Sequence, residues 1–362
     1  MSPPGVGPPP DQPPERAPGP EPPVPLPPLA DDPGVSVVVP ALNAPDGAPR
    51  AVRSALDQDG VDEVVVAAGD AATRQAVQAL DDPRVRVVDN PSGRTADALN
   101  AAIAATTGEV VVRLDAYAVL PEGYVDTALA ALRTTGAANV GGMQVPTAER
   151  GTARAIAAAM ASPAGAGGAT YRVGGSAGPV DTVYLGVFRR AALEQVGGFD
   201  PRFVRNQDGE LNLRLRRAGH TVWFVPELAV AYTPRASLAA LARQYGQYGR
   251  WRRLTVRTHP GSLALRQLAP PLLVVGLVLL AAVAALLGTG WPLALAVGGY
   301  AAGLLVAAAG AVQVLRDVPV TAAALATMHL AWGTGFLLGP PRALLAGSSS
   351  PPGDDQPPRS GG

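Results

Sequence analysis

The chain of 362 residues contains no cysteine and no lysine, so all 29 of its basic residues are arginines. The absence of cysteine excludes disulfides, thiolate catalysis and cysteine-based metal sites. Only three histidines occur, widely separated, which leaves no histidine-rich metal cluster. The 29 basic residues are balanced by 29 acidic ones. A net charge of zero gives no global electrostatic case for binding nucleic acid.

Both ends of the chain are rich in proline and poor in apolar residues. Residues 1–33 include 15 prolines and no apolar stretch of the kind that forms a signal peptide. We predict a disordered or polyproline-like tail there, with a proline-rich ligand for a partner domain as the alternative. Residues 346–362 have a similar composition and are predicted to form a second disordered tail.

Residues 34–234 alternate short apolar runs with helical patterns. Helices are expected, for example, over residues 71–80 and 94–106. Strands alternating with helices predict an open α/β sheet with right-handed crossovers. Ligands bind such sheets at the carboxyl ends of the strands, where Asp115 is expected. A short continuous apolar run at residues 35–40 predicts a strand buried on both faces of a parallel sheet, and further strands are expected at residues 61–67, 85–88 and 110–114.

The pattern is less regular from residue 137 to residue 200. The glycine-rich stretch 165–178 predicts a mobile loop, and a tolerated insertion is an equal alternative. A further strand is expected over residues 180–188. A helix over residues 208–218 would pair Glu210 with Arg214 one turn later.

The C-terminal third combines a basic segment with a long uncharged tract. Residues 235–266 hold arginines and aromatic residues, which is typical of a helix in the lipid headgroup layer. Residues 267–315 contain no charged side chain, and a bilayer core takes about 20 residues per helix. With residues 318–341, the region 267–345 predicts about three transmembrane helices; a buried soluble hairpin is the alternative. By the positive-inside rule, the arginines predict that residues 34–234 lie on the cytoplasmic face of the cell membrane, and three spans would place the C-terminus outside.

Two aspartates lie in patterns that suit chemistry. Asp115, in the segment 113–117 (RLDAY), ends a buried strand and suits a site for a metal-bound diphosphate, because hard divalent cations take carboxylate oxygens. The alternative is an aspartate that only leads into a turn. Asp208, in the segment 206–211 (NQDGEL), opens a helix and suits a general base. Its alternative is a carboxylate placed there by the helix dipole.

A third motif, QYGRW at residues 247–251, lies shortly before the first predicted span. Arginine offers paired donors to a phosphate, and an aromatic face suits the apolar side of a sugar. A basic and aromatic interfacial anchor is the alternative. Arg189 and Arg190 are candidates for further phosphate contacts or for a solvated helix start.

The order and spacing of these motifs resemble family 2 glycosyltransferases, most closely the succinoglycan-type exopolysaccharide glucosyltransferases. The resemblance covers residues 34–257 and implies a GT-A fold that transfers a hexose from a nucleotide diphosphate sugar with inversion. It implies that Asp115 holds Mg²⁺ or Mn²⁺ and that Asp208 deprotonates the acceptor. The QxxRW pattern, known from cellulose and hyaluronan synthases, implies an acceptor or diphosphate subsite made of Gln247, Arg250 and Trp251.

The same resemblance implies contacts with the nucleotide-sugar donor, expected to be a UDP-hexose. Pro40 and Asn43 correspond to the loop that cradles the nucleobase. Asp70 follows the second strand, where the family holds uracil and ribose; the alternative is that it caps the next helix. Asn100 lies in the helix that leads towards the metal motif.

The chain departs from the family pattern at four positions. Ala44, Ala68, Tyr117 and Gln207 stand where acidic residues are common, although succinoglycan-type enzymes have histidine in place of Tyr117. Two alternatives therefore stay open: a catalytically degenerate scaffold in polysaccharide assembly, and a polyprenyl-phosphate glycosyltransferase. The expected partners are a nucleotide-sugar donor, a lipid-linked or polysaccharide acceptor and membrane lipids, with no nucleic acid.

Overall fold

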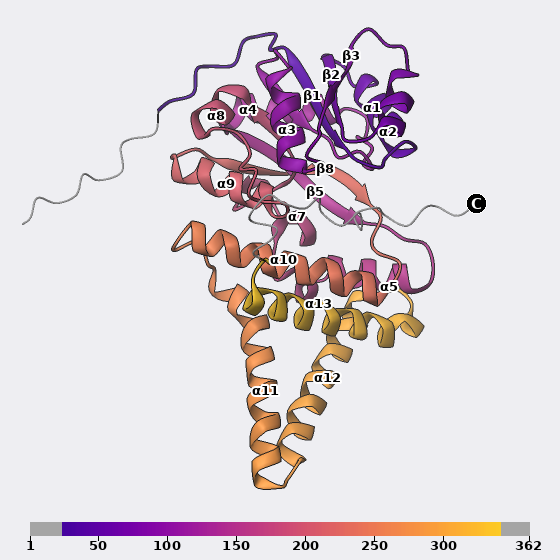
Figure 1. The fold of residues 1–362 in the computed structure, drawn as a ribbon, viewed down its shortest axis with the longest axis vertical. Helices are drawn as coiled ribbons and strands as arrows, with labels where there is room; N and C mark the ends of the chain where they lie inside the picture. The colour runs from indigo at the N-terminus through magenta and orange to yellow at the C-terminus, as the bar shows by residue number, and fades with distance from the viewer. Residues whose placement is uncertain (1–23, 342–362) are drawn as a thin grey trace, which may run out of the picture.

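The structure, a computed structural model, describes residues 24–341 in three tiers (Figure 1). A sheet domain lies above a layer of helices, and two long helices project from that layer away from the sheet. The tails predicted for residues 1–23 and 346–362 lie outside the described residues.

The sheet has eight strands in the order β3-β2-β1-β4-β7-β5-β8-β6. The first four in this order are mutually parallel, and β7 runs antiparallel between β4 and β5. The four predicted parallel strands are therefore confirmed, within an open mixed sheet. The strands are β1 (Val35–Ala41), β2 (Val61–Ala68), β3 (Val85–Asp89), β4 (Val110–Arg113), β5 (Asn139–Pro146), β6 (Gly178–Pro179), β7 (Tyr184–Arg189) and β8 (Val222–Tyr232).

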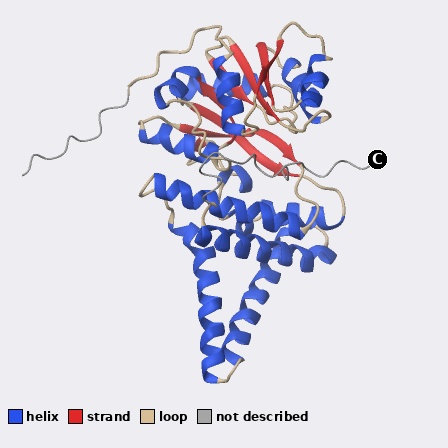
Figure 2. Cartoon of the chain, viewed as in Figure 1, coloured by secondary structure: helices blue, strands red, loops and turns tan. Residues whose placement is uncertain are grey.

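Helices cover both faces of this sheet (Figure 2). Because successive strand residues point to opposite faces, Val37 and Val39 pack into one hydrophobic core and Val38 into the other. Both cores are rich in valine and alanine, and the second core also buries Phe188, Phe199 and Phe224. The first core faces α1 (Gly47–Leu56), α2 (Ala71–Gln78) and α4 (Tyr124–Thr135), and the second faces α3 (Thr95–Ala104), α8 (Arg190–Val196) and α9 (Gln207–Arg217).

The glycine-rich stretch expected to be a mobile loop contains two short helices. After α5 (Gly151–Ala161), the chain forms α6 (Pro163–Ala166) and α7 (Thr170–Val173). A Cβ at Gly165 would lie 2.0 Å from the carbonyl oxygen of Ala159. The glycine therefore permits close packing of α6 on the end of α5, which a pattern of glycines alone did not predict.

The C-terminal helices are arranged in two directions (Figure 1). Helices α11 and α12 form the projecting hairpin, whereas α13 lies beside α10 under the sheet domain. Three helical segments are long and apolar enough to cross a membrane, beginning at Leu265, Trp291 and Leu315. The helices are α10 (Leu238–Thr258), α11 (Ala269–Leu287), α12 (Trp291–Ala311) and α13 (Val318–Leu338), with 3-10 turns at Leu265–Leu268 and Leu315–Asp317.

Polar contacts fasten α13 to the sheet domain along its length. At its start, Asp317 pairs with Arg154 of α5 at 2.7 Å. In its middle, the ring nitrogen Nε2 of His329 lies 2.9 Å from the carbonyl oxygen of Ala164. Near its end, Arg253 donates to the carbonyl oxygen of Leu337 at 2.7 Å. Helix α13 is thus docked from end to end.

Glycines bring α10 and α13 into backbone contact. A Cβ at Gly249 would lie 2.0 Å from the carbonyl oxygen of Trp332, and a Cβ at Gly335 would lie 2.1 Å from that of Gly246. A side chain at either position would force the helices apart, as it would at the small-residue crossings of membrane helices.

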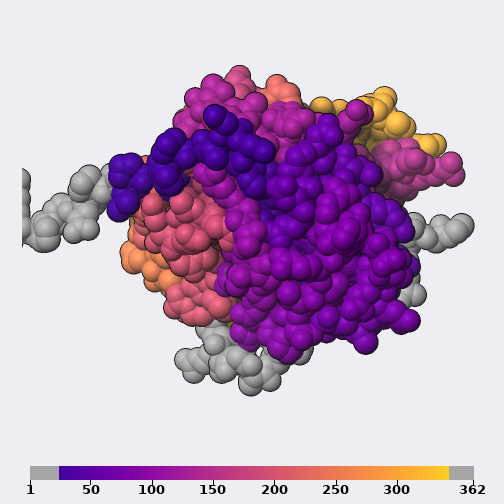
Figure 3. Space-filling model, turned by 90° about the horizontal axis from the view of Figure 1, so that it is seen from above, coloured from indigo at the N-terminus to yellow at the C-terminus, as the bar shows by residue number. Residues whose placement is uncertain are grey.

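Residues 24–33 form no helix or strand but lie across the surface of the sheet domain (Figure 3). Arg133 donates to the carbonyl oxygen of Asp31 at 2.8 Å, and the amide of Ala30 donates to Glu109 at 3.1 Å. The part of the predicted tail between residues 24 and 33 therefore packs against the domain that was expected to begin at residue 34.

Candidate functional site

A cavity of about 1120 Å³ lies between the sheet domain and the helical layer. Its upper wall is formed at the carboxyl ends of β1 and β4 and at the start of α9. Its lower wall is formed by α7, α10 and the first residues of α11, with contributions from α12 and α13. Pro40, Asn43, Asp115 and Asp208, four of the predicted site residues, line the upper wall.

Arg113 connects the two predicted catalytic carboxylates. It projects from the end of β4, and its side chain is only 7% exposed. Its Nη2 lies 2.9 Å from Oδ1 of Asp115, and its Nη1 pairs with Asp208. The structure thus places the two aspartates, 93 positions apart in the chain, on one guanidinium. The sequence contained a signal for this role of Arg113. It is a basic residue in an otherwise apolar strand, and it stands two positions before Asp115 and therefore on the same face.

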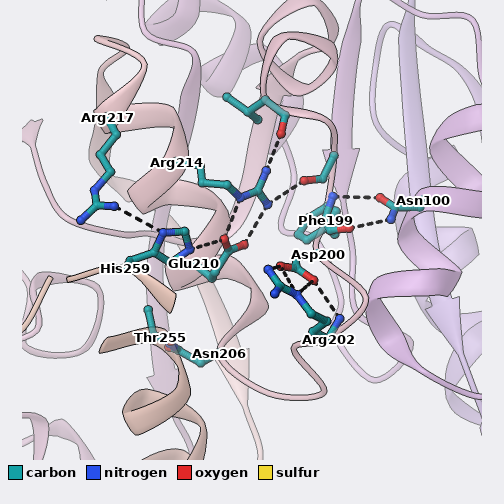
Figure 4. A network of polar contacts seen from close by, with 12 residues as sticks. Asn100, Phe199, Asp200, Arg202, Asn206, Glu210, Arg214, Arg217, Thr255 and His259 are labelled. Carbon is teal, nitrogen blue, oxygen red and sulfur yellow. Dashed lines mark hydrogen bonds and ion pairs between the residues drawn. The ribbon is translucent and has the colours of Figure 1, made fainter. Parts of the chain in front are cut away.

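The start of α9 is held by an unusual backbone conformation. Asn206 has φ of 61°, in the left-handed region, which asparagine enters more readily than most residues. Its Nδ2 donates to Oγ1 of Thr255 on α10 at 2.9 Å (Figure 4). This contact ties the first turn of α9, which carries Asp208, to the helical layer below. Strain of this kind is commonly kept where a site requires it.

Glu210 belongs to the framework of the site. It is completely buried and lies 2.7 Å from Arg214 and 2.8 Å from His259 (Figure 4). The predicted pairing of Glu210 with Arg214 is confirmed. Arg214 also donates to the carbonyl oxygens of Val196 and Gly198, so Glu210 is engaged and does not face the cavity.

Asp70 stabilises the loop that contains Asn43 by hydrogen bonding. It caps α2 by accepting from the amide of Thr73 at 2.9 Å, and it accepts from the amide of Asn43 at 2.6 Å. Burial alone would raise the pKa of the Asp70 carboxyl, but these hydrogen bonds outweigh it and lower the pKa below its usual value. The capping alternative is confirmed. Contact of Asp70 with a nucleobase stays a prediction.

Tyr117 replaces the second acidic residue of the metal motif with a structural contact. Its hydroxyl donates to the carbonyl oxygen of Asn43 at 2.7 Å. Its ring covers Gly47 so closely that a Cβ there would lie 2.6 Å from the ring. Tyr117 therefore fixes the loop between β1 and α1 against the end of β4, and it lines the cavity.

The donor set fits a divalent cation held mainly by substrate. Among residues 24–341, no group of three or more His, Asp or Glu side chains is arranged to hold a metal ion. Asp115 lines the cavity with 35% of its side chain exposed. Mg²⁺ commonly uses one or two carboxylates and completes its shell with phosphate oxygens and water. Asp115 together with a donor diphosphate meets that requirement.

The cavity carries an excess of positive charge. Burial lowers the pKa of Arg205 and of Arg252, yet a guanidinium stays protonated in proteins. Among residues 24–341, no glutamate lines the cavity, and the lining aspartates are Asp115, Asp181 and Asp208. This balance favours anionic ligands such as diphosphates. The lining arginines are Arg113, Arg172, Arg205, Arg216, Arg235, Arg252 and Arg266.

Asn100 does not reach the cavity, contrary to the prediction. Its Nδ2 donates to the carbonyl oxygen of Phe199 at 2.7 Å, and its Oδ1 accepts from the Phe199 amide at 2.9 Å (Figure 4). Both ends of the amide are thus used to fasten α3 to the segment before α9.

Arg189 and Arg190 are also structural. Arg189 pairs in the sheet with Val110, the first residue of β4, so it lies at the opposite end of that strand from Asp115. Arg190 donates to the carbonyl oxygen of Gly108 at 2.6 Å. Because β7 runs antiparallel to β4, its arginine end points away from the cavity, and the predicted phosphate contacts are wrong.

The QxxRW residues lie outside the cavity wall. The face of α10 that lines the cavity carries Tyr245, Tyr248 and Arg252, whose spacing of three and four residues defines one helical stripe. Gln247 accepts from Arg205 at 3.1 Å and touches the site only through it. The other two residues of the motif do not line the cavity. Trp251 is buried, with 2% of its surface exposed, and Arg250 lies against α13. This placement corrects the prediction of a free tryptophan face for the acceptor.

Comparison with known proteins agrees with this geometry. The family described as glycosyltransferase like family 2 matches residues 33–252. The succinoglycan biosynthesis protein ExoA of Rhizobium meliloti (strain 1021) is 32% identical over 281 residues, which cover 75% of this chain and 84% of ExoA. ExoO from the same strain is 41% identical over 87 residues, covering 23% of this chain and 25% of ExoO.

A solved structure shares the fold. The mannosyltransferase PcManGT from Pyrobaculum calidifontis, in complex with GDP-Man and Mn²⁺, aligns with a TM-score of 0.53 and 21% identity, covering 91% of this chain and 89% of that one. The likeness supports the GT-A fold. By family match, by sequence relatives and by fold, the chain belongs to the family 2 glycosyltransferases.

Proposed function

We propose that this enzyme passes a hexose from a nucleotide diphosphate sugar to a hydroxyl of a lipid-linked or polysaccharide acceptor, with inversion, at the cytoplasmic membrane face. The observation that carries the proposal is the placement of Asp115 and Asp208 on Arg113 in the wall of one cavity. The similarity to succinoglycan biosynthesis proteins supports a role in exopolysaccharide synthesis.

On the donor side, Asp115 would hold Mg²⁺ or Mn²⁺ on the diphosphate. When bound, the cation supplies positive charge against the developing charge of the leaving diphosphate. The loop of Pro40 and Asn43, held by Asp70 and Tyr117, would receive the nucleotide.

On the acceptor side, Asp208 would take the proton of the attacking hydroxyl. A single displacement requires one base opposite the leaving group and forms no covalent intermediate. The new bond joins the acceptor oxygen to the anomeric carbon, the bond to the diphosphate breaks with its electron pair, and the proton goes to Asp208. Arg113 pairs with both carboxylates and orients them.

The experiment is a donor screen on the purified membrane protein with UDP- and GDP-sugars and Mg²⁺ or Mn²⁺. Hydrolysis or transfer identifies the donor, and NMR of the product reads its anomeric configuration. A β-linked product from an α-linked donor is expected. A product that keeps the donor configuration would contradict the single displacement, and inactivity with every sugar donor would favour a scaffold.

The proposal includes two membrane spans. Helices α11 and α12 project from the domain, whereas α13 is docked to it by Arg154, Ala164 and Arg253. Helices α10 and α13 would then lie together at the membrane surface, and the chain would end on the catalytic side. This differs from the three spans and external C-terminus expected from composition.

A reporter fused after Gly362 tests this topology. A reporter that functions only in the cytoplasm should be active when it is fused there. If only a reporter that works outside the cell is active in this fusion, α13 crosses the membrane as a third span.

A further inference from the structure

Arg172 of α7 is a buried cation in the lower wall of the cavity. It is 8% exposed, and its guanidinium carbon lies 5.5 Å, 5.8 Å and 6.0 Å from the ring centres of Tyr171, Tyr245 and Tyr248. Its Nη1 donates to the hydroxyl of Tyr245 at 2.5 Å. Three aromatic faces and one phenol thus fix this side chain in a single place.

This guanidinium lacks the carboxylate partner that the equally buried Arg113 has. Arg113 pairs with Asp115 and Asp208, whereas no ion pair of Arg172 occurs within residues 24–341, and its buried Nε has no hydrogen-bond partner there. A buried charge is costly unless an opposite charge and hydrogen bonds compensate it. Cation–π contacts offset part of this cost, but they leave the Nε donor unused.

The surroundings of Arg172 indicate the nature of the missing anion. Within the same cavity, the part of the wall that α11, α12 and α13 contribute is largely apolar, apart from Tyr300 and His329. A ligand that fills this part must combine a negative group with a hydrophobic chain. The residues concerned are Pro270, Leu273, Tyr300, Met328 and Trp332.

We infer that Arg172 binds the phosphate or diphosphate of a lipid acceptor, whose hydrocarbon chain lies against α11, α12 and α13. The inference rests on the proposed transfer and names its acceptor class: a sugar that carries the attacking hydroxyl and is linked to a lipid phosphate or diphosphate. Arginine suits this task because its fork of N–H donors matches phosphate oxygens. The donor diphosphate belongs to the opposite wall, where Asp115 and the loop of Asn43 lie.

The test uses the full-length protein in lipid nanodiscs, with farnesyl diphosphate as the probe and farnesol as its uncharged match. In the wild type, farnesyl diphosphate should bind and raise the unfolding temperature. Farnesol should bind more weakly and raise the unfolding temperature less. Arg172→Gln should weaken farnesyl diphosphate binding about 10–100-fold, the range for a lost hydrogen bond between charged groups. Arg172→Lys should fall between the two.

Two controls separate this role from folding and from donor binding. Arg257→Gln removes an exposed arginine of the same helical layer that does not line the cavity, and it should leave lipid binding unchanged. UDP and GDP binding should be the same in Arg172→Gln as in the wild type. Weakened nucleotide binding with normal farnesyl diphosphate binding would assign Arg172 to the donor and overturn the inference.

The remaining outcomes are also decisive. Equal affinity of a folded Arg172→Gln variant for farnesyl diphosphate would overturn the inference. If that variant does not fold, the comparison of the two ligands on the wild type tests the inference instead. Equal affinity of the wild type for farnesol and farnesyl diphosphate would show that the protein has no phosphate site for the lipid. Lipid-phosphate binding through Arg172 in a protein that transfers no sugar would leave the inference standing and contradict the proposed function.

Discussion

The upper and lower halves of the cavity are built from different elements. In the upper half, Asp115 follows a strand whose residues are all buried in a parallel sheet, and Asp208 begins a helix packed on that sheet. In the lower half, α10 rests on α13, where glycines such as Gly249 allow backbones to touch. The upper half is fixed by strand register, and the lower half by the packing of helices.

This difference separates the chemistry from the choice of acceptor. Carboxylates at strand ends keep their geometry because the strands on either side fix it. The helical layer is held by side-chain packing between helices, and we expect that its wall can change residue by residue without moving Asp115. Each of the following predictions tests whether a change in one half stays within that half.

The largest effect is expected for Asp208→Asn. The amide keeps the size of the side chain but takes no proton, and loss of a positioned base costs about 10²–10⁴-fold in rate. Transfer should fall by this factor while donor binding and the unfolding temperature stay close to those of the wild type. Glu210→Gln is the contrast, because it breaks a buried ion pair and should cost about 3–5 kcal/mol of stability instead. An unchanged transfer rate in Asp208→Asn would place the base elsewhere.

Asp115→Asn should come second, with a loss of about 10²–10³-fold, since a bound cation stabilises the transition state by several kcal/mol. EDTA should reproduce this loss in the wild type, and added Mn²⁺ or Mg²⁺ should restore activity. Donor affinity should fall, while binding of farnesyl diphosphate should not. Full wild-type activity in EDTA would refute the metal role of Asp115.

Gly249→Ala and Gly335→Ala should act on the lower half alone. Each added Cβ would meet a backbone carbonyl of the facing helix, and overpacking of this kind costs about 1–3 kcal/mol. The free energy of unfolding in detergent should drop by that amount, and the KM for the acceptor should rise more than the KM for the donor. Gly298→Ala is the matched control, because its Cβ meets nothing within 4 Å.

Tyr117→Phe should have the smallest effect. It keeps the ring against Gly47 and removes only the hydrogen bond to Asn43, which is worth about 0.5–1.5 kcal/mol. The KM for the donor should rise by up to about tenfold, and the KM for the acceptor should not change. A change confined to the acceptor would show that the loop of Asn43 serves the lower half.

The sheet and the two aspartates could be predicted because each depends on a short stretch of sequence. A valine-rich run such as 35–39 is buried on both faces, and Asp115 had to lie at a strand end once the run before it was a strand. The sequence did not reveal which end of the sheet a residue faces. Arg189 follows a run as apolar as the one before Asp115, but its strand is antiparallel.

The helical layer was harder to predict because composition does not determine orientation. Helix α13 has the length and apolarity of a span, yet contacts distant in sequence, from Arg154 to Asp317 and from Ala164 to His329, lay it against the domain. Arg172 was missed for the same reason, since only the fold brings it to the tyrosines of α10.

The most direct test of the central claim is one set of steady-state measurements that determines both KM values, for the donor and for a lipid-phosphate acceptor, in Asp115→Asn and Arg172→Gln. If the two halves bind the two substrates, Asp115→Asn should raise the KM for the donor alone, and Arg172→Gln should raise the KM for the acceptor alone. A shift of the same KM in both variants would contradict the division of the cavity into a donor half and an acceptor half.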